Sequence, residues 1–140
     1  MPGLLRTCVV LLLATLFLTG QPARADENAI RSVIAGQIEA FRRDDGPAAW
    51  AYASPGIQAL YPAPSVFLDM VRQGYAPCYR PRQVGFLDLV RDDTGAPVQT
   101  VELIGPDGLL YLAHYQMEQQ PDGSWKISAV WLERLQGGVS

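Results

Sequence analysis

Apolar residues in the first half of the chain recur at the spacing of a helix. Between Asn28 and Asp44 one of them falls at every third or fourth position, which predicts a helix with one buried face. These residues are Ile30, Val33, Ile34, Ile38 and Phe41. Asp26 or Asn28 would cap the start of this helix, and Gly46 would end it.

Shorter helical segments are predicted next, separated by residues that break helices. They cover residues 47–52, 57–61 and 64–73. Gly74 would cap the last of them. Between Tyr75 and Arg82, Pro77 and Pro81 are incompatible with a central strand, so we expect an extended connector there.

The second half of the chain alternates between apolar and polar residues. Strands are predicted over residues 83–91, 98–104, 109–119 and 125–135. Each of the three turns between them contains an Asp ahead of a glycine that can adopt a positive φ: Gly95, Gly108 and Gly123. This arrangement is typical of an antiparallel meander.

The alternation also assigns faces to the last two strands. One apolar face would hold Leu109, Tyr111, Ala113, Tyr115 and Met117 of the third strand and Trp125, Ile127, Ala129 and Trp131 of the fourth. We expect all three tryptophans, Trp50 included, to lie in the core. Helices followed by a meander predict an α+β domain in which the helices pack on one face of a curved, four-stranded antiparallel sheet.

The first 25 residues have the pattern of a cleavable signal peptide. Arg6 precedes an apolar run, and Ala23 and Ala25 provide the small side chains that a signal peptidase requires. The apolar run of about a dozen residues is shorter than the roughly 20 that span a bilayer. We therefore expect cleavage after Ala25 and export, to the periplasm in a bacterium or outside the cell otherwise. Residues 26–140 would form a single domain with no membrane attachment.

Processing would change the charge and the cysteine content. It removes Arg6 and Arg24, so that nine basic residues remain against fourteen acidic ones, a net charge of −5. No basic stripe remains, which argues against nucleic acid as a partner. Cys8 is also removed. Cys78 would then be alone, without a disulfide, and is expected to be a buried small side chain rather than a nucleophile.

Few of the remaining residues support catalysis through a metal or cofactor. His114 is the single histidine, so a multi-histidine metal site is not expected, and no phosphate-binding glycine motif occurs. We expect neither a metal nor a cofactor. On the third strand His114 would be a partly exposed residue near Glu118.

Several segments of the chain resemble the bacterial family called domain of unknown function 4864. They are Ile30–Ile34, Phe41–Asp45, Ala53–Ile57, Met70–Tyr75, Tyr79–Arg82 and Gln120–Ser128. The resemblance implies an NTF2-like or cystatin-like cone, in which a curved sheet wraps around helices and leaves a cavity at its wide end. It implies no catalytic residues, because cones of this kind include both enzymes and binding modules.

In a cone, the junction between the last helix and the sheet borders the cavity mouth. Its arginines and tyrosines would suit a small anionic or aromatic ligand: Arg72, Tyr75, Tyr79, Arg80 and Arg82. The alternative is structural. The aromatic rings would pack on the core and the arginines would face Asp or Glu on neighbouring strands.

Two functions follow from these expectations. The first is a non-catalytic exported module that binds a small molecule or a partner protein, and two copies could pair through the sheet. The second is a cofactor-free lyase or isomerase, for which Asp88 or Glu102 with Tyr52 or Tyr111 are the available pairs. The enzyme requires an acid and a tyrosine hydroxyl to converge in one cavity.

Overall fold

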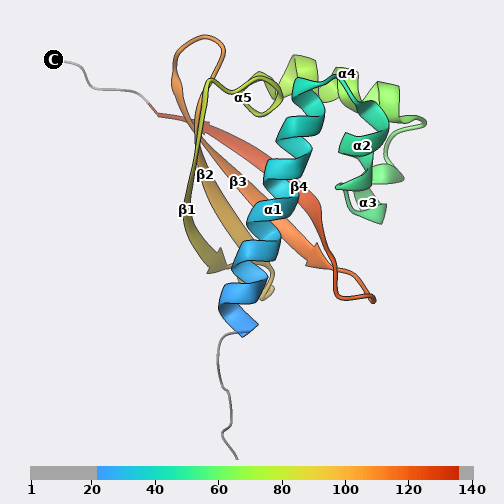
Figure 1. Ribbon diagram of the computed structural model, residues 1–140, viewed down its shortest axis with the longest axis vertical. Coiled ribbons are helices and arrows are strands. Elements are labelled where there is room, and N and C mark those ends of the chain that lie inside the picture. The colour runs from blue at the N-terminus through green and yellow to red at the C-terminus, as the bar shows by residue number, and fades with distance from the viewer. Residues whose placement is uncertain (1–21, 136–140) are drawn as a thin grey trace, which may run out of the picture.

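The computed structural model describes residues 22–135, which form five helices followed by four strands (Figure 1). The helices are α1 (Pro22–Arg42), α2 (Gly46–Ala51), α3 (Pro55–Gln58), α4 (Pro64–Gly74) and α5 (Ala76–Tyr79). The strands are β1 (Gln83–Arg91), β2 (Pro97–Ile104), β3 (Leu110–Gln119) and β4 (Trp125–Arg134). Most of the predicted signal peptide falls outside the described residues, so cleavage after Ala25 stays a prediction.

The long helix α1 has the predicted buried face. Ile30, Ile34 and Phe41 are at most 1% exposed. The predicted start of α1 was wrong, because the helix already begins at Pro22 and neither Asp26 nor Asn28 caps it. Alanine and glutamate around these positions favour helix, so the helix begins before the segment with periodic apolar residues. Among the described residues, no helix is long and apolar enough to cross a membrane.

Side-chain caps set the starts of the two short helices after α1. Asp45 Oδ1 accepts a hydrogen bond from the backbone N–H of Ala48 at the start of α2 (3.1 Å). Ser54 Oγ caps α3 in the same way through Ile57 N–H (3.3 Å). Because of this cap, α3 begins at Pro55 rather than at the predicted Ile57.

The connector after α4 differs from its prediction. It contains the helical turn α5 and is not extended, because Pro77 occupies the first turn, where a proline removes no helical hydrogen bond. Gly74 is the last residue of α4, and Tyr75 rather than Gly74 is its C-cap. These two corrections place Tyr75 at the corner between α4 and α5.

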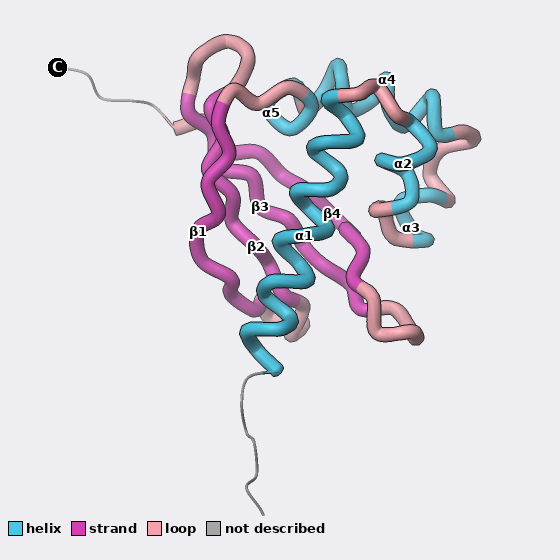
Figure 2. The backbone as a smooth tube through the Cα atoms, viewed as in Figure 1, coloured by secondary structure: helices cyan, strands magenta, loops and turns pink. Residues whose placement is uncertain are grey.

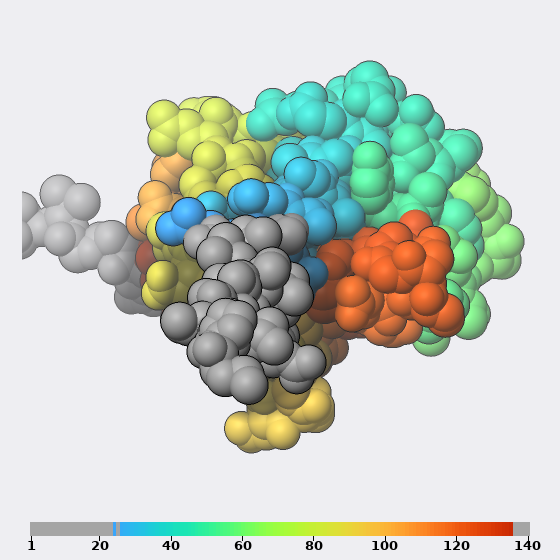
Figure 3. All heavy atoms as spheres, turned by 60° about the horizontal axis from the view of Figure 1, so that its bottom comes forward, coloured from blue at the N-terminus to red at the C-terminus, as the bar shows by residue number. Residues whose placement is uncertain are grey.

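The sheet is the predicted antiparallel meander, with strand order β1-β2-β3-β4. Gly95, Gly108 and Gly123 have φ angles of 83°, 77° and 86°, as the turns require. The sheet is open and curved, consistent with a cone. Helix α1 lies across one of its faces, with α2, α3 and α4 beside it near β4 (Figure 2). Figure 3 shows the helices packed against the β3–β4 end and the β1–β2 turn projecting away.

A bulge in β4 reverses the predicted alternation. Ser128 has no partner on β3, so it is an extra residue in β4. Beyond it, Val130 lies opposite Tyr115 on the inner face, and Trp131 lies opposite His114 on the outer face. The prediction that Trp131 belongs to the core was therefore wrong, because its side chain is 46% exposed. A one-residue insertion moves every later side chain to the other face.

Candidate functional site

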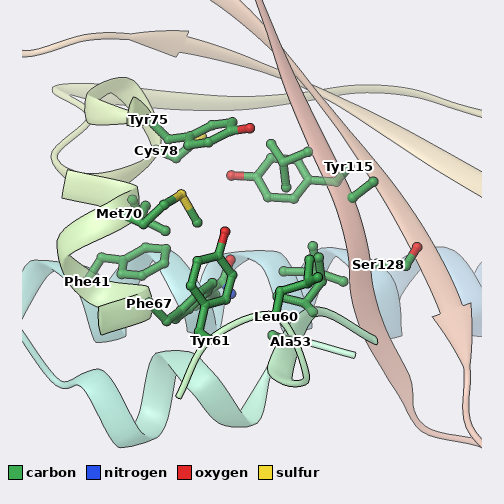
Figure 4. Close-up of a pocket in the computed structure, with 16 residues that line it drawn as sticks. Phe41, Ala53, Leu60, Tyr61, Phe67, Met70, Tyr75, Cys78, Tyr115 and Ser128 are labelled. Atoms are coloured by element: carbon green, nitrogen blue, oxygen red, sulfur yellow. The ribbon is translucent and has the colours of Figure 1, made fainter. Parts of the chain in front are cut away.

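A pocket of about 280 Å³ lies between the helices and strands β3 and β4 (Figure 4). Its walls come from α1, α3, α4, α5, the segment after α3 and the two strands. Aromatic rings form much of the lining. The Phe67 ring centroid is 6.0 Å from that of Phe41 and 5.7 Å from that of Tyr61. The Met70 side chain points in from α4.

Three tyrosine hydroxyls point toward the middle of this pocket (Figure 4). Tyr61 reaches in from the segment between α3 and α4, Tyr75 from the corner between α4 and α5, and Tyr115 from β3. Tyr115 is only 1% exposed. Its hydroxyl oxygen is the buried side-chain polar atom of the described residues that lacks a hydrogen bond of normal geometry, and its polar neighbour is the Cys78 thiol, a weak hydrogen-bonding group. An unpaired hydroxyl in such a place is costly, because it has lost its contact with water.

Tyr115 and Cys78 are both uncharged near neutral pH. Burial raises the pKa of Tyr115 well above its usual value, and the charge of the neighbouring Cys78 thiol and a weak hydrogen bond with it raise that pKa further. Burial also raises the pKa of Cys78, to about 11. The prediction of a buried cysteine is confirmed, since Cys78 is 3% exposed. A thiol with this pKa does not form the nucleophilic thiolate at physiological pH.

Two other polar side chains of the lining donate hydrogen bonds to backbone carbonyls. The Gln37 amide Nε2 donates to the carbonyl of Ala49 (3.2 Å). Ser128 Oγ donates to the carbonyl of Gln116 (3.1 Å) and points away from the pocket (Figure 4). The hydroxyl groups directed into the pocket are therefore those of the three tyrosines.

Of the five residues suggested by the sequence, Tyr75 lines the pocket and the other four lie outside its lining. Three of them join Asp44 in what we call the connector cluster: Asp44, Arg72, Tyr79 and Arg80. The Arg72 and Arg80 guanidinium carbons lie 5.5 and 4.6 Å from the centre of the Tyr79 ring. Arg82, further along, donates from Nη2 to the Pro106 carbonyl (2.6 Å).

Asp44 binds two members of the connector cluster, Tyr79 and Arg80. Arg72 instead pairs with Asp69 on its own helix (3.5 Å). The Tyr79 hydroxyl donates to Asp44 Oδ1, and Arg80 Nη2 donates to the same oxygen (2.8 Å). These bonds, the one from Tyr79 first, lower the pKa of Asp44. Arg80 also donates to the carbonyl of Phe41 near the end of α1. The expected acidic partner on a neighbouring strand was therefore wrong: the partner is at the end of the first helix.

The acid–tyrosine pairs of the enzyme alternative lie outside the pocket lining. Asp88 and Glu102 are exposed on β1 and β2. The Tyr111 hydroxyl donates to Asp107 Oδ2 (2.6 Å), outside the pocket. No aspartate or glutamate is among the residues that line the pocket within residues 22–135.

His114 lies on the outer face of the sheet, away from the pocket. Its Nδ1 is 3.2 Å from Thr100 Oγ1, and its Nε2 is 3.3 Å from Glu133 Oε2. Its ring stacks on Trp131 with 5.3 Å between centroids. The predicted neighbour Glu118 was wrong, because β4 brings Glu133 alongside. In the described part of the chain, no three potential ligand side chains gather as a metal site would require.

The family described as "Domain of unknown function (DUF4864)" matches residues 23–138. The chain belongs to this family. The DUF4864 match includes every residue of the pocket lining, from Gln37 to Val130. No curated protein matches the chain. The family resemblance expected from the sequence is thus confirmed.

Sequence reasoning missed Tyr61 and Tyr115 as site residues. Tyr115 was assigned to the apolar inner face of β3, which the structure confirms. A tyrosine at such a position is a useful signal, because a buried hydroxyl needs a partner that phenylalanine would not. The partner itself cannot be read from local sequence.

Proposed function

We propose that this protein is an exported, non-catalytic module that binds a small apolar molecule in the pocket between its helices and β3–β4. The observation that carries the proposal is the buried, unpartnered hydroxyl of Tyr115 beside an aromatic lining. Pockets that are mainly apolar, with a few convergent polar groups, are typical of small-molecule sites.

The energetics support a ligand for Tyr115. An unsatisfied buried hydroxyl costs about 1–3 kcal/mol. A bound molecule that hydrogen-bonds this hydroxyl would recover part of that free energy and bury its own apolar surface, at about 25 cal/mol per Å². The enzyme alternative receives no such support, because the described residues of the lining include no carboxylate to act as acid or base.

Export is the second part of the proposal. Its support is the pattern of residues 1–25, with small residues at Ala23 and Ala25. The full chain would be expressed in a bacterium and its periplasmic fraction analysed by intact mass. A mass equal to residues 26–140 is expected, and full-length protein confined to the cytoplasm would contradict export.

Binding can be tested with 1-aminoanthracene, a neutral aromatic dye whose fluorescence rises in apolar sites. Ile57 lies half-buried in the lining, so Ile57→Trp would fill part of the pocket. We expect this variant to weaken dye binding at least about tenfold, the effect of roughly 1.4 kcal/mol. The exposed Val66 of α4 lies outside the lining, and Val66→Trp is the matched control.

Circular dichroism would first establish that both variants are folded. Equal dye affinity in both would show that the dye binds elsewhere. Absence of dye binding to the unaltered protein, together with no co-purified molecule in native mass spectrometry, would reject the binding function.

A further inference from the structure

We infer that the pocket selects uncharged ligands that carry one hydrogen-bonding oxygen, such as an alcohol, a phenol or a ketone, on a compact aromatic or alicyclic body. This inference rests on the proposed function and adds the chemical class of the ligand. It also assigns Tyr115 as the residue that recognises the ligand oxygen.

The charge of the site excludes an anion. No arginine, lysine or histidine is among the residues that line the pocket in the described part of the chain. Arg80, the arginine nearest in sequence to Cys78, is already paired with Asp44 and with the Phe41 carbonyl. A carboxylate in this pocket would lose its hydration without gaining a cation, which is strongly unfavourable.

A cation is disfavoured for a related reason. Its favourable contacts in proteins are carboxylates and the faces of aromatic rings. Among residues 22–135 no carboxylate lines the pocket, and the three tyrosines direct their hydroxyl ends toward its middle (Figure 4). Phenol hydroxyls instead donate to, or accept from, a neutral oxygen.

The volume and the mouth of the pocket define the rest of the ligand. A cavity of about 280 Å³ is at the small end of ligand sites, so a body of one or two rings fits better than a long chain. Leu60, which is 71% exposed, is the lining residue most open to solvent and marks the mouth. Tyr115 lies at the buried end, so the oxygen of the ligand enters first.

The Tyr115 hydroxyl has almost no exposed surface of its own, so a ligand has to displace neighbouring side chains to reach it. In Figure 4 the Met70 thioether lies on the opposite side of the pocket from the Tyr115 ring. Methionine is unbranched and repacks at low cost, so it can yield to a ring of the ligand.

Four compounds that share one ring system test the inference: naphthalene, 2-naphthol, 2-naphthoate and trimethyl(2-naphthyl)ammonium. Their dissociation constants would be measured by displacement of 1-aminoanthracene. We expect 2-naphthol to bind about fivefold more tightly than naphthalene, as one net hydrogen bond provides. Both ions should bind at least about tenfold more weakly than 2-naphthol.

Tyr115→Phe separates the hydroxyl from the shape of the pocket. It should abolish the preference for 2-naphthol over naphthalene and leave naphthalene binding intact. Tyr111→Phe is the matched control: Tyr111 is on the same face of β3 but outside the pocket, and its hydroxyl donates to Asp107. This variant should retain the preference.

The outcomes distinguish the two proposals. If none of the four compounds binds, the proposed binding function fails with them. If naphthalene binds but either ion binds as tightly as 2-naphthol, the function stands and the inferred ligand class is wrong. A preference for 2-naphthol that survives in Tyr115→Phe would show that Tyr115 does not recognise the oxygen.

Discussion

Tyr79 and Tyr115 are both buried, yet their hydroxyls differ in hydrogen bonding. Tyr79 is 4% exposed, and its hydroxyl donates to Asp44 with Arg80 bound to the same carboxylate. Tyr115 is 1% exposed, and among the described residues its hydroxyl makes no hydrogen bond of normal geometry and lies beside the weakly hydrogen-bonding Cys78 thiol. A tyrosine whose hydroxyl is hydrogen-bonded within the protein stabilises the fold. A buried tyrosine hydroxyl beside a pocket, without such a bond, is free to form one with a ligand.

The connector cluster explains why Tyr79 is satisfied. Asp44 has a φ of 53° and follows the end of α1, a position where the left-handed conformation ends a helix. Arg80 donates to the Phe41 carbonyl at this same end, where a positive charge is favourable. The cluster therefore joins α5 to the C-terminus of α1, and its polar groups are used within the protein.

The largest effect should come from removing the ring of Tyr79. This ring packs on Phe41 with 5.5 Å between centroids, and Tyr79→Ala leaves a cavity there. We expect a loss of about 3–5 kcal/mol in the free energy of unfolding, measured by urea denaturation. A loss below about 1 kcal/mol would mean that the connector cluster is not part of the stabilising core.

Removing only the hydroxyls should give smaller effects of opposite sign. Tyr79→Phe loses a satisfied hydrogen bond and should destabilise by about 1 kcal/mol. Tyr115→Phe removes a buried unsatisfied group and should stabilise the ligand-free protein by roughly 0.5–1 kcal/mol. Thermal unfolding of the two variants measures both. Destabilisation by Tyr115→Phe would show that its hydroxyl is satisfied, which would remove the main support for the binding proposal.

The smallest expected effect is a change with pH in the Tm difference between the unaltered protein and Tyr79→Phe. Tyr79 and Arg80 hold the pKa of Asp44 below its ordinary value of 3.8. A carboxyl with a lowered pKa in the folded state stabilises the protein above the unfolded-state pKa, and this contribution is lost as the pH falls through the folded-state pKa. The difference in Tm between the unaltered protein and Tyr79→Phe should therefore stay constant from about pH 7 to 5 and shrink below about pH 4.

Tyr115→Phe is the control for this titration, because no carboxylate is bonded to Tyr115. Its Tm difference should not change over the same pH range. If the Tm difference for Tyr79→Phe were equally constant, ionisation of Asp44 would not contribute to the stabilising effect of the Tyr79 hydroxyl.

The sheet was easier to predict than the helix ends. The predicted strand 83–91 matches β1, and the glycines at the three turns have the expected positive φ. The start of α1 and the helical turn α5 were missed, because favourable propensity extended one helix and Pro77 is compatible with a first turn. Of the predicted ligand residues, Tyr75 lines the pocket, while Arg72 and Arg80 contact Tyr79 outside it.

The sequence by itself determined the family, the α+β order of elements and the inner face of β3, because periodicity and turn chemistry act between residues close in the chain. Only the tertiary structure decided which polar groups meet. Asp44 reaches Tyr79 across 35 positions, and the bulge at Ser128 places Val130 rather than Ala129 opposite Tyr115. Whether a buried hydroxyl finds a partner depends on such distant contacts. This is why the connector looked like the site in the sequence, and why Tyr115 stands out only in the folded molecule.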